Sequence, residues 1–92
     1  MKSHLKEREP VLISISDKAF VKSSAIAQII RRDSARVKRL TDAAAQSGML
    51  INATGGKRPG SIILLTSDHV VLSALGPEII KSRLKRMANP VP

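Results

Sequence analysis

The chain has 92 residues, with 16 Lys and Arg against 7 Asp and Glu, and therefore a formal net charge of +9. This length allows one small domain, which disfavours a deep catalytic cleft, and the charge favours a polyanionic partner, most often nucleic acid. Phe20 is the one aromatic residue, which argues against single-stranded nucleic-acid modules that stack bases on aromatic rings.

The chain ends have a composition unlike that of the centre. We expect residues 1–10 to form a flexible basic extension, residues 11–87 a single domain, and residues 88–92 a frayed tail. The N-terminal segment is charged throughout and lacks the apolar stretch of a secretion signal, and no apolar run reaches the length of a membrane span. Cysteine is absent. We therefore expect a cytoplasmic protein with no membrane partner.

The first part of the domain is extended. Residues 11–15 (VLISI) predict a strand, and residues 20–24 (FVKSS) continue as extended chain after a turn. Residues 25–30 (AIAQII) fit a helical stripe as well as a short buried strand. Periodicity over so short a segment does not decide between them.

The clearest helix is predicted over residues 34–47. Asp33 or Ser34 can cap its free N–H groups, and Gly48 supplies a left-handed C-terminal stop. Its apolar face consists of Val37, Leu40, Thr41 and Ala44. This spacing is typical of a helix that packs on a sheet.

The second half alternates strands and turns before a last helix. Strands are predicted over 49–54 (MLINAT), 61–66 (SIILLT) and 69–73 (HVVLS), which would make Gly55 to Gly60 the tip of a hairpin. A helix over 77–87 follows, with a packing stripe of Ile80, Leu84 and Met87. These elements predict an α+β domain with a small antiparallel sheet and two helices.

The glycine-rich stretch ATGGKRPGS does not fit a nucleotide-phosphate loop. A P-loop requires Gly five places before the Gly-Lys pair and Ser or Thr after it, but Ile51 and Arg58 occupy these positions. The stretch also leads into a predicted strand rather than into a helix N-terminus. We therefore expect no nucleotide hydrolysis.

Two other polar features favour structural roles. Ser67, Asp68 and His69 are adjacent, and we interpret them as a hairpin turn rather than as a hydrolase triad. His4 and His69 are isolated histidines in a chain without cysteine, so we expect no metal site. We also expect no cofactor, no small-molecule substrate and no catalytic residue.

The positive charge is uneven along the chain. It gathers in three clusters: Arg31, Arg32, Arg36, Lys38 and Arg39; Lys57 and Arg58; and Lys81, Arg83, Lys85 and Arg86. Each cluster could be only a solvated face. The pair Lys57 and Arg58 differs from the others because it lies in a glycine-flanked loop, where phosphate or groove contacts are easily made.

Residues 50–84, LINATGGKRPGSIILLTSDHVVLSALGPEIIKSRL, preceded by SARVKRLTDAAAQSGM, resemble the bacterial extracellular-matrix regulator RemA family. The similarity extends without gaps from about Val11 to Leu84. This chain differs from the family pattern at Ala25, Gly55, Pro59 and Gly60, and its lead-in of about ten residues looks like an addition.

The resemblance implies a DNA-binding transcription regulator that acts as a homo-oligomeric ring and has a LytTR-like fold. It implies a strand at 25–30 and places the family's DNA-binding arginines at Lys57 and Arg58. Additional DNA contacts are expected at Lys22, Arg31, Arg32, Lys38 and Arg39. We expect duplex DNA and further copies of the chain as partners, and a nucleoid-associated location. The alternative is a small basic RNA-binding or protein-interaction scaffold.

Overall fold

The computed structural model describes residues 12–17 and 19–88, and side chains up to residue 86. The predicted extension at 1–10, most of the predicted tail and the Met87 side chain lie outside this part. In chain order the elements are β1 (Leu12–Ser14), β2 (Phe20–Lys22), a short 3-10 turn η2 (Ser23–Ala25), β3 (Ile26–Arg31), α1 (Val37–Gln46), β4 (Leu50–Ala53), β5 (Ser61–Leu65), β6 (Val70–Ser73) and α2 (Pro77–Ala88).

The strands form two sheets. β1 and β2 pair as an antiparallel hairpin, and the other four strands form a sheet in the order β3-β5-β6-β4. In this sheet β3–β5 and β5–β6 are antiparallel, whereas β4 and β6 are parallel. The α+β class with two helices is confirmed, and the larger sheet is mixed where the sequence predicted an antiparallel one.

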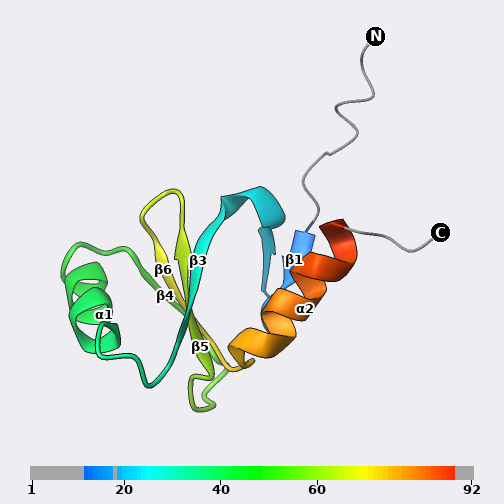
Figure 1. Ribbon diagram of the computed structural model, residues 1–92. Helices are drawn as coiled ribbons and strands as arrows, with labels where there is room; N and C mark the ends of the chain where they lie inside the picture. The colour runs from blue at the N-terminus through cyan, green and yellow to red at the C-terminus, as the bar shows by residue number, and fades with distance from the viewer. Residues whose placement is uncertain (1–11, 18, 89–92) are drawn as a thin grey trace, which may run out of the picture.

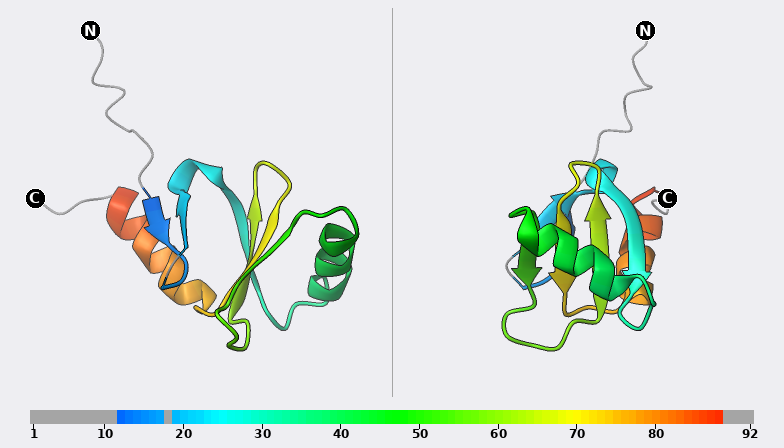
Figure 2. Two further views of the ribbon diagram at one scale, coloured as in Figure 1. Left: turned by 180° about the vertical axis from the view of Figure 1, so that it is seen from behind. Right: turned by 90° about the vertical axis from the view of Figure 1, so that its left-hand side faces the viewer.

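The predicted hairpin with its tip at Gly55 to Gly60 is wrong. β4 and β5 are not neighbours, because β6 lies between them. The seven-residue loop 54–60 instead crosses the end of β6 to join the edge strand β4 to the inner strand β5, as Figure 2 shows in its right-hand view. The tight β5–β6 turn at Ser67 and Asp68 is as predicted.

The four-stranded sheet has a packed layer on each face: α1 covers one face, and α2 with the β1–β2 hairpin covers the other (Figure 1). Neighbouring residues of β5 point to opposite faces, and both Ile62 and Ile63 are fully buried. This explains why SIILL is apolar at consecutive positions. The core on the α1 face contains Ile30, Ala44, Ile62 and Val70, and the core on the α2 face contains Ile15, Ile63, Val71 and Ile80.

Residues 26–31 form the edge strand β3, which resolves the ambiguity of this segment. Ile29 packs against the α2-side core while its neighbour Ile30 is buried on the α1 side. Apolar side chains on both faces of one extended segment suit a strand between two helical layers. The pairing with β5, from Ile26↔Leu65 to Arg31↔Ser61, fixes its register.

The helix predicted from residue 34 begins at Val37. Asp33 pairs with Arg31 instead of capping the helix, and the Ser34 hydroxyl accepts the Arg36 N–H at 3.2 Å in the turn before it. Gly48, with φ 74, ends the helix as predicted. Within the described residues, no helix is long and apolar enough to cross a membrane.

Arg83 was grouped with the cations that coat the last helix, but it has a structural contact. Its guanidinium Nη1 donates a hydrogen bond to the backbone oxygen of Ser14 at 2.8 Å. The buried hydroxyl of Ser73 donates a hydrogen bond to the backbone oxygen of Ile15 at 2.5 Å. These two bonds join α2 and β6 to the β1–β2 hairpin.

Candidate nucleic-acid interface

The connections that carry Arg32 and Arg36, and Lys57 and Arg58, meet at one end of the four-stranded sheet. The pairings Arg31↔Ser61, Ser61↔Ser73 and Ala53↔Ser73 place the ends of β3, β4 and β6 beside the start of β5. The connections 32–36, 54–60 and 74–76 therefore lie together, and we call this region the loop end (Figure 1). The β5–β6 turn lies at the opposite end.

The glycine-rich loop begins with a tight turn. The Lys57 N–H donates to the Thr54 oxygen at 3.1 Å, and the two central residues, Gly55 and Gly56, have φ of 64° and 86°. Positive φ at both central positions is typical of a type I′ turn, which glycine adopts at little cost. The Asn52 side-chain oxygen accepts hydrogen bonds from the Thr54 hydroxyl and N–H at 2.7 and 3.0 Å. Lys57 thus emerges from a well-defined turn.

The other end of the loop is fixed by a different contact. The Gly60 N–H donates to the Ser73 oxygen at 2.7 Å, and a Cβ at Gly60 would lie 2.6 Å from the Ala74 oxygen. Gly60 therefore allows close approach of two backbones rather than a left-handed turn. Lys57 and Arg58, both exposed, lie between these two anchors.

Lys57 and Arg58 line different concave surfaces. Arg58 lines a groove of about 640 Å³ between α1 and the sheet, which also includes Arg32 and is floored by Val37, Leu50, Ile62 and Leu72; we call it the α1 groove. Lys57 lines a hollow of about 560 Å³ on the other face, between the loop, β4 and the turn of the β1–β2 hairpin; we call it the hairpin hollow. Two cations that are adjacent in sequence thus lie at hollows on opposite faces of the sheet.

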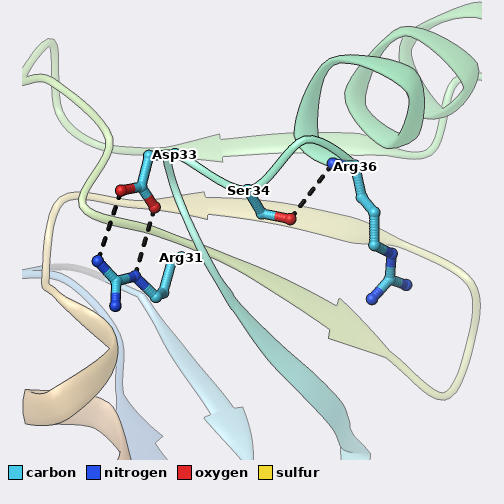
Figure 3. A network of polar contacts seen from close by, with 4 residues as sticks. All are labelled: Arg31, Asp33, Ser34 and Arg36. Atoms are coloured by element: carbon cyan, nitrogen blue, oxygen red, sulfur yellow. Dashed lines mark hydrogen bonds and ion pairs between the residues drawn. The ribbon is translucent and has the colours of Figure 1, made fainter.

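Two acidic residues, Asp33 and Asp42, are paired with two of the predicted contact residues. Arg31 binds Asp33 through Nε at 3.3 Å and Nη2 at 3.4 Å (Figure 3), and Lys38 binds Asp42 at 3.0 Å. All four side chains are mostly exposed, so these pairs are weak, but each cancels a positive charge locally.

Arg32 and Arg58 line the α1 groove together with the carboxylates of Asp33 and Asp42. Neither arginine has an ion pair within the part of the chain that the structure describes. Arg32 also lines a smaller hollow of about 280 Å³ with Arg31, Glu78 and Gly60. Arg36 is exposed, and its side chain extends away from Arg31 and Asp33 (Figure 3).

The remaining predicted contact residues lie elsewhere. Arg39 is exposed on α1, and Lys22 is exposed on β2 in the hairpin. Lys85 and Arg86 lie in the last turn of α2, whose first turn starts at the loop end, so they are remote from Arg58. The structure therefore brings Arg58 and Arg32 to one groove, places Lys57 of the same loop at a hollow on the other face, and separates Lys22 from this group.

The turn at Ser67 and Asp68 contains one contact that the sequence interpretation did not include. Ser67 Oγ and His69 Nδ1 are 2.8 Å apart, around Asp68, whose φ is 74°. Both side chains lie at the surface of a two-strand turn, and no hollow described above includes either of them. Their contact stabilises the turn.

The comparisons with known proteins agree on one family. The sequence profile of the RemA-like family, described as "Extracellular matrix regulatory protein A-like", matches residues 12–84. A protein of Carboxydothermus hydrogenoformans named "Putative regulatory protein" is 40% identical over 77 residues, which cover 84% of this chain and 88% of that protein. A protein of Heliobacterium modesticaldum with the same name is 44% identical over 73 residues, which cover 79% of this chain and 80% of that protein.

Proposed function

The chain belongs to the RemA-like family of regulatory proteins, and we propose that it is a DNA-binding transcriptional regulator that works as a homo-oligomeric ring. Duplex DNA is bound or wrapped at the loop ends of successive copies. The observation that carries the proposal is the placement of Lys57 and Arg58 on an exposed, anchored loop beside Arg32, which has no ion pair among the described residues. In this proposal the protein acts on nucleoid DNA in the cytoplasm and has no catalytic role.

The chemistry of the loop end suits a phosphate backbone. The guanidinium groups of Arg58 and Arg32 can each donate two parallel hydrogen bonds to a phosphate, whereas Lys57 supplies a point charge. The anchored turn keeps these side chains exposed without the entropy cost of ordering a long loop. Because Arg31 and Lys38 already have acidic partners, they contribute less net charge to the surface.

A ring supplies the affinity that one loop lacks. A few phosphate contacts per copy give weak and salt-sensitive binding. Repeating the same contacts around an oligomer on one DNA raises the effective concentration of each loop. Binding then depends on the assembled particle more than on any single copy.

The first test removes the charge of the loop. We expect the Lys57→Ala, Arg58→Ala double variant to remain folded and to lose retention of duplex DNA in a gel-shift assay. The matched control is Lys85→Ala, Arg86→Ala, which removes the same charge from the last turn of α2 and is expected to bind nearly as the parent chain does. Equal loss in both variants would indicate a nonspecific effect of net charge, and no loss in the loop variant would refute the proposal.

Competition separates DNA from RNA. With labelled duplex DNA at fixed salt, we expect unlabelled duplex DNA to compete better than structured RNA of equal length. Stronger competition by the RNA would contradict the DNA assignment and favour an RNA-binding scaffold.

A further inference from the structure

The outward face of the β1–β2 hairpin carries two exposed large apolar side chains. Phe20 is 59% exposed and Leu12 is 61% exposed, although the inward residue Ile13 on the same hairpin is only 1% exposed. In the register Leu12↔Lys22 and Ser14↔Phe20, side chains two residues apart share a face. Phe20 and Leu12 therefore lie on one surface, with the ammonium group of Lys22 beside them.

A matching concave surface exists on the same chain. The hairpin hollow, about 560 Å³, is lined by the apolar residues Ala19, Ile51, Ala53 and Leu75, and by two residues of opposite charge, Asp17 and Lys57. Ile51 is 43% exposed on the edge strand β4. Asp17 has no ion pair within the described part of the chain. Phe20 and Leu12 do not line this hollow.

We propose that Phe20 of one copy inserts into the hairpin hollow of the next copy, with Lys22 of the first copy pairing with Asp17 of the second. An apolar side chain next to a cation thus meets an apolar hollow next to a carboxylate. This inference rests on the proposed function, because it assigns the surfaces through which the proposed ring assembles.

The charges favour head-to-tail contact between copies over symmetric contact. Packing the outward hairpin face against itself would bring Lys22 close to Lys22 of the other copy, and the other residues of that face, Leu12, Ser14 and Phe20, include no carboxylate. In the head-to-tail contact, Asp17 offsets one of the two ammonium charges of Lys22 and Lys57. Each copy presents both surfaces, and they are different surfaces. Such a heterologous interface leaves one surface free at each end of a short assembly, so that growth ends when a ring closes.

The proposed contact also concerns the DNA-binding loop. Gly55 and Lys57 line the hairpin hollow, so the incoming Phe20 and Lys22 would lie beside the loop. Lys22, which the structure separates from the loop end within one copy, would approach Lys57 of the neighbouring copy. The basic surface would then continue from one copy to the next.

The mass in solution, measured by light scattering without DNA, tests the contact. We expect the parent chain to be oligomeric, and both Phe20→Lys and Ile51→Lys to be monomeric with unchanged circular dichroism. The control is Ile79→Lys, which changes an equally exposed isoleucine on α2 outside both surfaces and should stay oligomeric. A monomeric parent chain, or an oligomer in either surface variant, would overturn the proposal.

Mixing distinguishes a head-to-tail interface from a symmetric one. Phe20→Lys retains an intact hollow and Ile51→Lys retains an intact Phe20, so an equimolar mixture should form dimers and nothing larger. A mixture that stays monomeric would overturn the proposal.

Cysteine pairing gives a second readout that does not depend on disrupting the contact. The chain contains no cysteine, so Lys22→Cys and Asp17→Cys each introduce a single thiol. We expect disulfide-linked dimers on a nonreducing gel from the mixture but not from either variant alone. Dimers from Lys22→Cys alone, or none from the mixture, would contradict the head-to-tail contact.

The two proposals can fail separately. If the mass and cysteine results are as expected but Lys57→Ala, Arg58→Ala still retains DNA, the proposed function is wrong and the interface stands. If that variant loses DNA while Phe20→Lys remains oligomeric, the interface is wrong and DNA binding stands.

Discussion

Gly60 illustrates how a single residue positions the basic loop. Its N–H binds the Ser73 oxygen, and the backbone of residues 74 and 75 lies so close that a Cβ would be 2.6 Å from the Ala74 oxygen and 2.7 Å from the Leu75 oxygen. Backbone atoms cannot move aside as a flexible side chain can. Any larger residue must therefore push the loop away from the β6–α2 connection.

We expect Gly60→Ala to lower the free energy of unfolding by about 1–3 kcal/mol, in the range of overpacking substitutions. The control is Gly76→Ala, where an added Cβ meets nothing within 4 Å. Urea denaturation should give a lower midpoint for Gly60→Ala than for Gly76→Ala. Equal midpoints would show that the loop relaxes without cost.

At the scale of elements, the β1–β2 hairpin depends on its attachments. It is not hydrogen-bonded into the larger sheet, and a lone two-stranded hairpin is marginally stable in water. Burial of Ile13 and Ile15 and the hydrogen bonds from Ser73 and Arg83 hold it in place. These attachments also orient the outward face that carries Phe20.

Replacing Arg83 by Met removes the charge-assisted hydrogen bond to Ser14 and retains much of the apolar stem. We expect a loss of about 1 kcal/mol in the free energy of unfolding, since the guanidinium is partly exposed. Arg86→Met makes the same chemical change at an exposed position and should cost less than about 0.5 kcal/mol. Chemical denaturation of both variants measures the difference, which would vanish if the Arg83 bond contributed nothing.

At the scale of the whole molecule, the strand order concentrates charge at one end of the sheet. Four exposed cations of two separate sequence clusters, Arg31, Arg32, Lys57 and Arg58, meet at the loop end because β3, β4 and β6 all finish there. In the proposed function, each copy offers DNA only a few phosphate contacts. The salt dependence of DNA binding therefore reports how many copies engage one DNA.

We expect the slope of log affinity against log salt to be clearly steeper than about −2, the value for two phosphate contacts at about 0.9 each. Fluorescence anisotropy with labelled duplex DNA at about 50 to 200 mM salt measures it. In the Phe20→Lys variant, which the proposed interface predicts to be monomeric, the slope should become shallower, although one charge is added. A parent slope near −2 would mean that one copy binds at a time.

Much of the secondary structure follows from local signals that the sequence displays. The stripe Val37, Leu40, Thr41 and Ala44 predicts α1, Gly48 ends it, and Pro77 begins α2. The apolar run of β5 indicates a strand buried on both faces. Helix periodicity, capping and turn chemistry act over a few residues, so a sequence reveals them directly.

The pairing of the strands could not be predicted from these local signals. Consecutive strands are usually neighbours, and this tendency predicted a hairpin for β4 and β5. The structure inserts β6 between them and pairs β4 with β6 in parallel, a contact between residues about twenty positions apart. Such pairings depend on which side chains fill both cores at once, and no local pattern encodes that choice.

For the candidate site, too, some features could be predicted from the sequence and others required the tertiary structure. By itself the sequence determined most of the elements and the resemblance to a regulatory family, and it predicted Lys57 and Arg58 as a site, because motifs, charge and glycine content can be read from local spacing. Only the tertiary structure decided that Arg58 shares a groove with Arg32, that Lys57 lines a hollow on the other face, and that Arg83 supports the hairpin. These relations arise from strand order and layer packing, which join residues that are distant along the chain.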